Sequence, residues 1–170
     1  MALLSATVLP FCNRRQALFF AGGLVATGML ATAAAGQPWA VIGVVVLACL
    51  AAGLSSRVSA GVFGVAPIVA AVLGVNPPGA SPLRVGVVMA LVCAYIAAVV
   101  IIAGVHLPPT PLPTSVAARH GVVMALACGA ATAVALHFEW SHAYWLVTTL
   151  AVVLRPYAGD SLRRSRDRIA

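Results

Sequence analysis

The residues of this chain that could bind a metal ion lie mainly in one short segment. His137–His142 contains two histidines and a glutamate, and imidazole and carboxylate groups are ligands that zinc accepts. The sequence offers no third helix-borne ligand beside them. Trp140, Tyr144 and Trp145 accompany the segment, and such aromatic residues with polar neighbours are typical of the belt at a membrane surface. We therefore predict a segment at headgroup level and no metal site.

Acidic side chains are too few and too poorly placed for most intramembrane catalysis. Glu139, Asp160 and Asp167 are the only ones, and none lies in the middle of an apolar run. Aspartyl proteolysis in a membrane needs paired carboxylates, and a carboxylate proton relay needs at least one at depth. No G-x-S-x-G motif occurs, and the histidines are scattered, which argues against a Ser/His hydrolase. We predict that the protein is not an enzyme and uses no cofactor.

The four cysteines, Cys12, Cys49, Cys93 and Cys128, are far apart and form no C-x-x-C pair. This spacing encodes neither a zinc site nor a redox motif. The last three fall inside apolar runs, where a thiol behaves as a small hydrophobic group. We predict no disulfide and no metal binding at these residues.

Six apolar runs must position all of these residues. The chain is 62% hydrophobic and 8% charged with a mean hydropathy of +1.07, whereas soluble domains carry roughly 25% charged residues. Runs of about 20 apolar residues are long enough to cross a membrane as helices. The predicted fold class is all-α, a polytopic integral membrane helical bundle with about six transmembrane helices. The runs are approximately Gln16–Ala35, Pro38–Leu54, Val58–Val75, Val85–Val105, Ala117–Leu136 and Phe138–Leu154.

The arginines lie almost entirely on one side of these runs when the loops are assigned alternately to two sides. The other side receives only Arg84. This bias is what the positive-inside rule predicts for a multi-pass protein of the cell (inner or plasma) membrane with both termini in the cytoplasm. The net charge of +7 is then explained by arginines that contact anionic lipid headgroups, and we predict no binding of nucleic acid. The arginines assigned to the cytoplasmic side are Arg14, Arg15, Arg57, Arg119, Arg155, Arg163, Arg164, Arg166 and Arg168.

Breaks in the apolar pattern divide the chain into five segments. Residues 1–15 are predicted to be a cytoplasmic N-terminal segment, 16–105 a four-helix membrane segment, 106–116 a proline-rich linker, 117–154 a two-helix membrane segment, and 155–170 a basic cytoplasmic tail. The linker is expected to be extended, because proline fixes φ and lacks a donor.

The first run loosely resembles an export signal, since Arg14 and Arg15 precede it and Ala33-Ala34-Ala35 ends it. Its length suits a complete span, and only Gly36 and Gln37 separate it from the next run. A tight helical hairpin there leaves little room for a peptidase. We therefore favour an uncleaved first span.

Two features inside the runs allow more than one interpretation. The third run contains Pro67, which predicts a helix kink; such interruptions occur at transport sites and, more often, as plain kinks. Arg84–Cys93 and Arg119–Cys128 match at eight of ten positions and would run in opposite directions, as in an inverted repeat. Chance similarity between helices rich in Ala, Val and Gly is the explanation that we favour. Small residues at spacing four, such as Ala127, Ala131 and Ala135, favour close helix packing.

The last third of the chain carries a more specific pattern. Arg119-His120-Gly121 opens one run, Tyr144-Trp145 is followed by Thr149, and the run ends at Arg155-Pro156 before further arginines. Over about the last 50 residues this pattern resembles the fusaric-acid-resistance-like family. That family, also called the integral membrane bound transporter domain, groups bacterial aromatic-acid exporters with plant aluminium-activated malate transporters.

The resemblance implies a membrane transporter or transporter subunit for efflux of small organic anions or aromatic acids. In the family the arginine segment leads into further membrane helices, whereas this chain stops at Ile169-Ala170. The resemblance therefore implies that the chain is a truncated member of the family, that it forms a homo-oligomer, or that it needs a partner membrane subunit. The alternative is a non-transporting membrane scaffold or gene remnant whose basic tail binds lipid or a partner.

A substrate pathway would use residues of the last two runs. Tyr144 and Trp145 would anchor the outer end of the sixth run, while Thr148 and Thr149 would either face the pathway or bond to the preceding turn. Arg119 and Arg155 would attract anions at the inner side or serve only as topology anchors. The candidate pathway residues are thus Arg119, Tyr144, Trp145, Thr148, Thr149 and Arg155.

Overall fold

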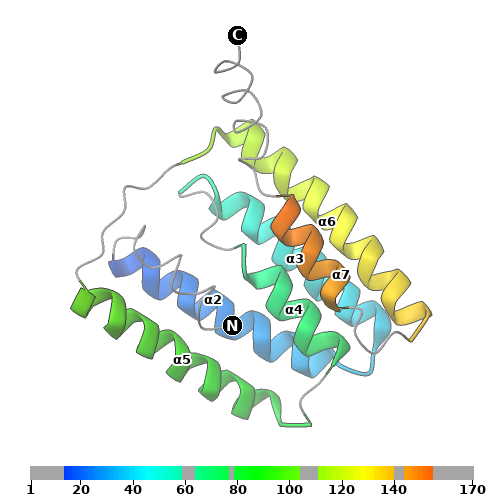
Figure 1. Ribbon diagram of the computed structural model, residues 1–170, viewed down its shortest axis with the longest axis horizontal. Helices are drawn as coiled ribbons and strands as arrows, with labels where there is room; N and C mark the ends of the chain where they lie inside the picture. The colour runs from blue at the N-terminus through cyan, green and yellow to red at the C-terminus, as the bar shows by residue number, and fades with distance from the viewer. Residues whose placement is uncertain (1–13, 59–63, 77–78, 104–110, 140–143, 155–170) are drawn as a thin grey trace.

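All the regular secondary structure in the described part of the chain is helical. The computed structural model describes residues 14–58, 64–76, 79–103, 111–139 and 144–154. Each of the six apolar runs contains one helix, which confirms the predicted all-α class (Figure 1). The helices are α2 (Arg14–Ala34), α3 (Pro38–Ser55), α4 (Ala66–Val75), α5 (Pro82–Ala103), α6 (Thr114–His137) and α7 (Tyr144–Val153).

Three of these helices are long and apolar enough to cross a membrane. They are α3, the Pro82–Val99 part of α5, and α6. These spans of 18, 18 and 24 residues are about 27, 27 and 36 Å long at about 1.5 Å per residue, against a hydrocarbon core of about 30 Å. The helices α4 and α7 have ten residues each, about 15 Å. Residues 59–63 and 140–143, which precede them, lie outside the described residues.

Consecutive helices run in alternating directions, so the chain weaves back and forth across one bundle (Figure 1). The helix α5 lies at one edge beside α2, and α6 lies at the other edge beside α3. Between them, α4 packs on α2 and α3, and α7 packs on α4 and α6. The contact between α3 and α6 is the most extensive in the bundle. The predicted segments 16–105 and 117–154 therefore share one core.

Small residues make the contact between α3 and α6 close. A Cβ atom added to Gly53 would lie 2.7 Å from the backbone nitrogen of Gly121 and 3.0 Å from the carbonyl oxygen of Ala117. Ala117, Gly121, Ala125 and Gly129 repeat at spacing four along α6, and all four are buried. Such small stripes let helix backbones approach, and van der Waals contact then stabilises the pair.

Methionines fill the contact between α2 and α5. A Cβ on Gly86 would lie 2.6 Å from the sulfur of Met29, and a Cβ on Gly28 would meet the sulfur of Met89. The two pairs are reciprocal, with one glycine and one methionine from each helix. Thioether side chains are flexible and fill irregular gaps, so this contact can adjust more easily than the one between α3 and α6.

Prolines and one glycine define several helix boundaries. Pro38 stands in the first turn of α3, where its missing N–H costs no helical hydrogen bond. Gly36 turns the first hairpin with a φ of +88°, a conformation that strains other residues. Pro67 also stands in a first turn, that of α4, after a turn at Gly64–Val65. Pro67 therefore stands at the start of the described helix, while residues 59–63 before it lie outside the described residues, so the predicted kink stays a prediction.

The last part of the predicted linker is described, and it contacts α3. The backbone N–H of Leu112 donates to the carbonyl oxygen of Ser56, at 3.0 Å. This contact places the start of α6 beside the end of α3. Arg57 and Arg119 therefore lie at one end of the bundle, whereas Arg84, in the first turn of α5, lies at the other.

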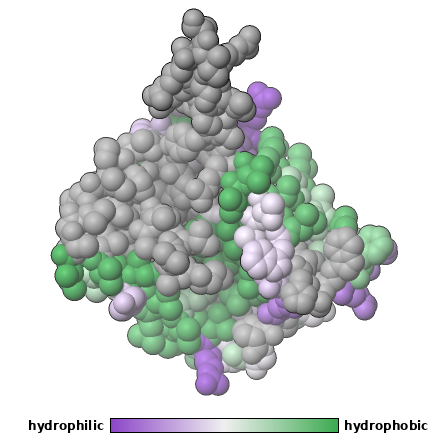
Figure 2. Space-filling model, viewed as in Figure 1, coloured by the Kyte–Doolittle hydropathy of each residue, from purple (hydrophilic) through white to green (hydrophobic). Residues whose placement is uncertain are grey.

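Large apolar side chains cover much of the surface. On α5 the exposed fraction reaches 66% for Leu91, 68% for Tyr95 and 85% for Ile102. Hydrophobic residues also predominate among the described residues visible in Figure 2. Contiguous apolar surface of this kind indicates contact with lipid or with another protein. With three candidate spans, it indicates a multi-pass membrane protein in contact with the bilayer.

Candidate functional site

The candidate pathway residues do not meet in one cavity. Arg119 is exposed near the start of α6, whereas Tyr144 begins α7, next to the end of α6 in the chain. The 18 residues between Arg119 and His137 correspond to about 27 Å of helix, so Arg119 and Tyr144 lie at opposite ends of the bundle. Arg155 lies outside the described residues.

The helix α7 turns one face toward the bundle and another away from it. Val147 is fully buried and Ala151 is nearly so. Trp145 and Thr149 lie on the outer face, and 60% of Trp145 is exposed. Tyr144 is half-buried, and its ring lies 5.7 Å from that of Trp145 between ring centroids. Of the residues predicted to line a pathway, Tyr144 and Thr148 are therefore partly buried, whereas Trp145 and Thr149 lie on the outer surface of the bundle.

Both candidate threonines bond to their own helix. The hydroxyl of Thr148 donates to the carbonyl oxygen of Tyr144, and that of Thr149 donates to the carbonyl oxygen of Trp145, each at 2.8 Å. Buried Thr132 does the same with Cys128, at 2.7 Å. Bonding to the preceding turn satisfies a hydroxyl where water is scarce. The sequence left two roles open for Thr148 and Thr149, and in the structure both hydroxyls bond to the preceding turn.

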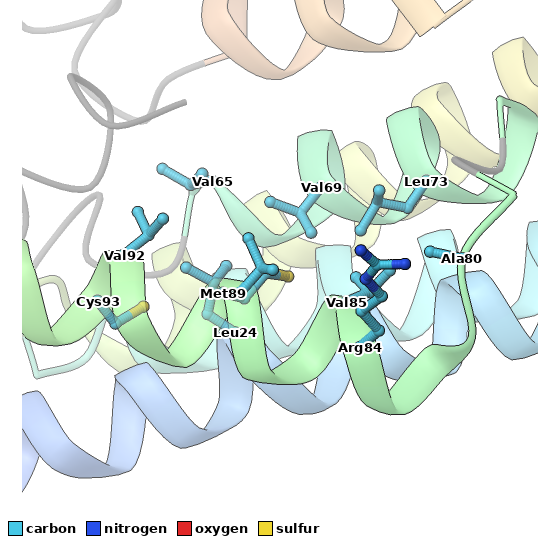
Figure 3. Close-up of a pocket in the computed structure, with 11 residues that line it drawn as sticks. Leu24, Val65, Val69, Leu73, Ala80, Arg84, Val85, Met89, Val92 and Cys93 are labelled. Atoms are coloured by element: carbon cyan, nitrogen blue, oxygen red, sulfur yellow. The ribbon is translucent and has the colours of Figure 1, made fainter.

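A groove that the sequence did not reveal lies between α4 and α5, with α2 beneath it (Figure 3). Its volume is about 360 Å³, and Arg84 is the one charged residue among the described residues that line it. Its signal in the sequence was weak: an arginine separated from all the others by the predicted topology, and apolar residues at spacing four. The lining residues are Leu24, Val65, Val69, Leu73, Ala80, Arg84, Val85, Val88, Met89, Val92 and Cys93.

A second cavity of about 290 Å³ lies between α2 and α3. Phe19, Phe20 and Leu47 are among its apolar walls, and none of the described residues that line it is charged. Two hydroxyls line it, and both already bond within their own helices: Thr27 donates to the carbonyl oxygen of Gly23 at 2.8 Å and Ser55 to that of Ala52 at 2.9 Å. Nothing in this cavity distinguishes a ligand from a lipid chain.

The contact between α3 and α6 joins two cysteines that lie 79 positions apart in the chain. The side chains of Cys49 and Cys128 are both buried, share a hydrogen bond, and are not linked by a disulfide. Cys93, also a free thiol, is half-buried and lines the groove of Figure 3. No local sequence pattern pairs Cys49 with Cys128, because the pairing depends on which helices meet.

The segment of potential metal ligands is described only in part. His137 lies at the end of α6, with its ring 5.1 Å from that of Phe138 between centroids. Glu139 follows with a φ of +50°. His142 lies outside the described residues, and among those described no group of three or more histidine, cysteine or acidic side chains gathers. The absence of a metal site stays a prediction from the sequence.

Comparisons with family models, with curated proteins and with solved structures found no match to this chain. The resemblance to the fusaric-acid-resistance-like family therefore depends on the sequence motifs alone, and what it implies about function is a proposal.

Proposed function

We propose that the chain is a subunit of a membrane transporter for small organic anions or aromatic acids. In this proposal all six apolar runs span the membrane and both termini face the cytoplasm. The alternating helix directions support it, because Arg57 and Arg119 share one end of the bundle and Arg84 lies at the other. An excess of arginine at one end is typical of the cytoplasmic side.

The outer face of α7 is the observation that carries this proposal. Trp145 and Thr149 point away from the bundle, so a pathway built on them is closed only when another subunit covers that face. The proposal therefore requires a homo-oligomer or a partner membrane subunit. Aromatic rings at such an interface offer flat apolar surfaces to an aromatic acid. Arg119 and Arg155 would raise the local concentration of anions at the cytoplasmic end.

Flux measurement tests the proposal. The purified protein is reconstituted in liposomes, and uptake of radiolabelled benzoate is compared with that of protein-free liposomes. We expect uptake that falls when Trp145 is replaced by alanine and persists when exposed Leu91 of α5 is replaced by alanine. Background uptake by a helical, monodisperse preparation, both alone and with any cotranslated membrane partner, would contradict the proposal.

Crosslinking tests the required interface separately. Single cysteines replace Thr149 or Ala151 in a variant whose native cysteines are alanine. A short bifunctional maleimide should join two copies through position 149, which faces out, and not through position 151, which is buried. Equal crosslinking at both positions would show that α7 does not form the interface.

A non-transporting scaffold is the second candidate, and one observation favours it. The hydroxyls of Thr148 and Thr149 are used within α7, which leaves Trp145 the role of an aromatic anchor in the headgroup region. A scaffold would give background flux while its basic tail binds vesicles containing anionic lipid. A soluble carrier protein fused to residues 155–170 should then bind such vesicles, and the same carrier without these residues should not.

A further inference from the structure

The groove between α4 and α5 has two apolar walls and an apolar floor. One wall is formed by Val65, the N-cap residue of α4, and by Val69 and Leu73 within that helix; their spacing of four places them on one face (Figure 3). Val88 and Met89 belong to the opposite wall, on α5. Both α4 and α5 pack on α2, which contributes the floor. The groove is therefore a slot that runs along the helices.

The dimensions of the slot suit one small apolar body. Val65 and Leu73 are eight residues apart, which corresponds to about 12 Å along the helix. The volume of about 360 Å³ lies at the low end of the range of roughly 300–1,000 Å³ for small-molecule pockets. An extended carbon chain with bonds of about 1.5 Å advances about 1.25 Å per carbon, so a chain of about ten carbons matches this length.

Arg84 gives the slot a polar end. It is the third residue of α5, and its guanidinium points from α5 toward the α4 side, near Leu73 (Figure 3). The start of α5 adds the positive end of the helix dipole. Glu139, the only acidic residue among those described, follows α6, a helix that does not line the slot. The positive charge is therefore available to an external anion.

Physical chemistry then selects the kind of occupant. In a bilayer the apolar walls give little preference for a ligand over a lipid chain, because lipid tails are as apolar as the walls. Selectivity must come from the cation at the polar end. Arg84 stands at the end of a candidate span, where an anionic headgroup stays near water while its chain lies along the helices.

We propose that this slot binds a single-chain amphipathic carboxylate, a fatty acid of about ten carbons, with its carboxylate at Arg84 and its chain extending between Val69 and Val88 toward Cys93. The site depends on the membrane location of the bundle but not on transport. It is separate from the α7 face on which the proposed function depends.

Photolabelling tests the site in the full-length protein. The protein is placed in nanodiscs of zwitterionic phosphatidylcholine and irradiated with a decanoate analogue that carries an aliphatic diazirine near its chain end. Labelled positions are mapped by mass spectrometry. We expect label within residues 65–73 and 88–93, competed by decanoate and much less by decanol, which has the same chain and no charge.

Two pairs of variants separate the charge from the shape of the slot. Arg84→Gln should weaken competition by decanoate about fivefold to tenfold, because one charge-assisted contact is lost, while Arg57→Gln at the other end should not. Val88→Trp should abolish labelling by filling the slot. The matched control is Val87→Trp, at an exposed neighbour that does not line the slot. Far-UV circular dichroism and elution volume confirm that each variant is folded.

Three results would overturn the proposal. Equal competition by decanol and decanoate would show ordinary solvation of an apolar surface by lipid. Retained affinity in Arg84→Gln would show that the cation does not recognise the carboxylate. Crosslinks from the slot to a second copy of the chain, with no fatty-acid label, would show that protein fills it. Benzoate flux is measured separately, so a negative result for the fatty-acid site does not contradict the proposed transport function.

Discussion

Replacing Gly53 with alanine should destabilise the bundle by forcing α3 away from α6. The new Cβ would lie 2.7 Å from the nitrogen of Gly121 and 3.0 Å from the oxygen of Ala117. Both are backbone atoms, so no side-chain rotation relieves the overlap. The two helices must separate, and the close packing along the small stripe of α6 is lost with them.

The expected magnitude follows from two opposing effects. Overpacking a well-packed contact costs about 1–3 kcal/mol, and a clash with backbone belongs at the upper end of that range. Alanine gains up to about 1 kcal/mol over glycine in helix propensity. The net destabilisation of Gly53→Ala is therefore about 1–2 kcal/mol.

A control on the same helix isolates the clash. A Cβ on Gly43 meets nothing within 4 Å, so Gly43→Ala should be neutral or slightly stabilising. Gly121→Ala should be intermediate, because its Cβ would lie 3.1 Å from the Cα of Gly53 and at least 3.5 Å from its next neighbours. Unfolding in mixed micelles at increasing mole fraction of dodecyl sulfate, followed by circular dichroism, ranks the three. Equal stability of Gly53→Ala and Gly43→Ala would refute the packing of α3 on α6.

Three further predictions concern side chains on α3, α6 and α7. Copper-phenanthroline oxidation should form an intramolecular disulfide between Cys49 and Cys128, seen as one bridged peptide pair by mass spectrometry, and Cys49→Ala should abolish it; a predominant bridge to Cys93 would contradict the fold. Thr149→Val should leave thermal stability within about 1 kcal/mol of the parent, since its hydroxyl bonds only to its own helix; a larger loss would place that hydroxyl in an interhelical contact. Arg119→Gln should lower benzoate flux at unchanged abundance if this arginine attracts anions, whereas a changed orientation with normal flux per correctly inserted molecule would assign it to topology.

Much of the secondary structure was predictable because apolar runs and breakers coincide with helix boundaries. Pro38 begins α3 as expected, and Gly36 makes the turn before it. The kink at Pro67 was predicted because proline removes a helical hydrogen bond, but the residue type alone does not tell the first turn of a helix from its interior. The structure puts Pro67 in that first turn.

The packing of the helices was less predictable, because many alanine-rich faces are equivalent in sequence. Ala131 and Ala135, named from their spacing, are buried. The closest approach is nevertheless at Gly121, opposite Gly53, because only a pair of glycines allows backbone contact there. The groove at Arg84 was missed for the same reason: it needs α4 and α5 to flank α2, which no local pattern specifies.

The repeated segments offer a related comparison. Gly86 and Gly121 occupy equivalent positions in Arg84–Cys93 and Arg119–Cys128, and both face a neighbouring helix, α2 and α3 respectively. Shared packing roles are compatible with duplication and also with chance use of glycine at contacts.

Sided cysteine labelling tests the central claim, a multi-pass membrane bundle with its arginine-rich end in the cytoplasm, most directly. Arg57 and Ser81 are both exposed and lie at opposite ends of the bundle. Each is replaced by a single cysteine in a cysteine-free background and treated with a membrane-impermeant maleimide in intact cells. The account predicts labelling of position 81 from outside and of position 57 only after permeabilisation. Labelling of both positions from the same side would contradict it.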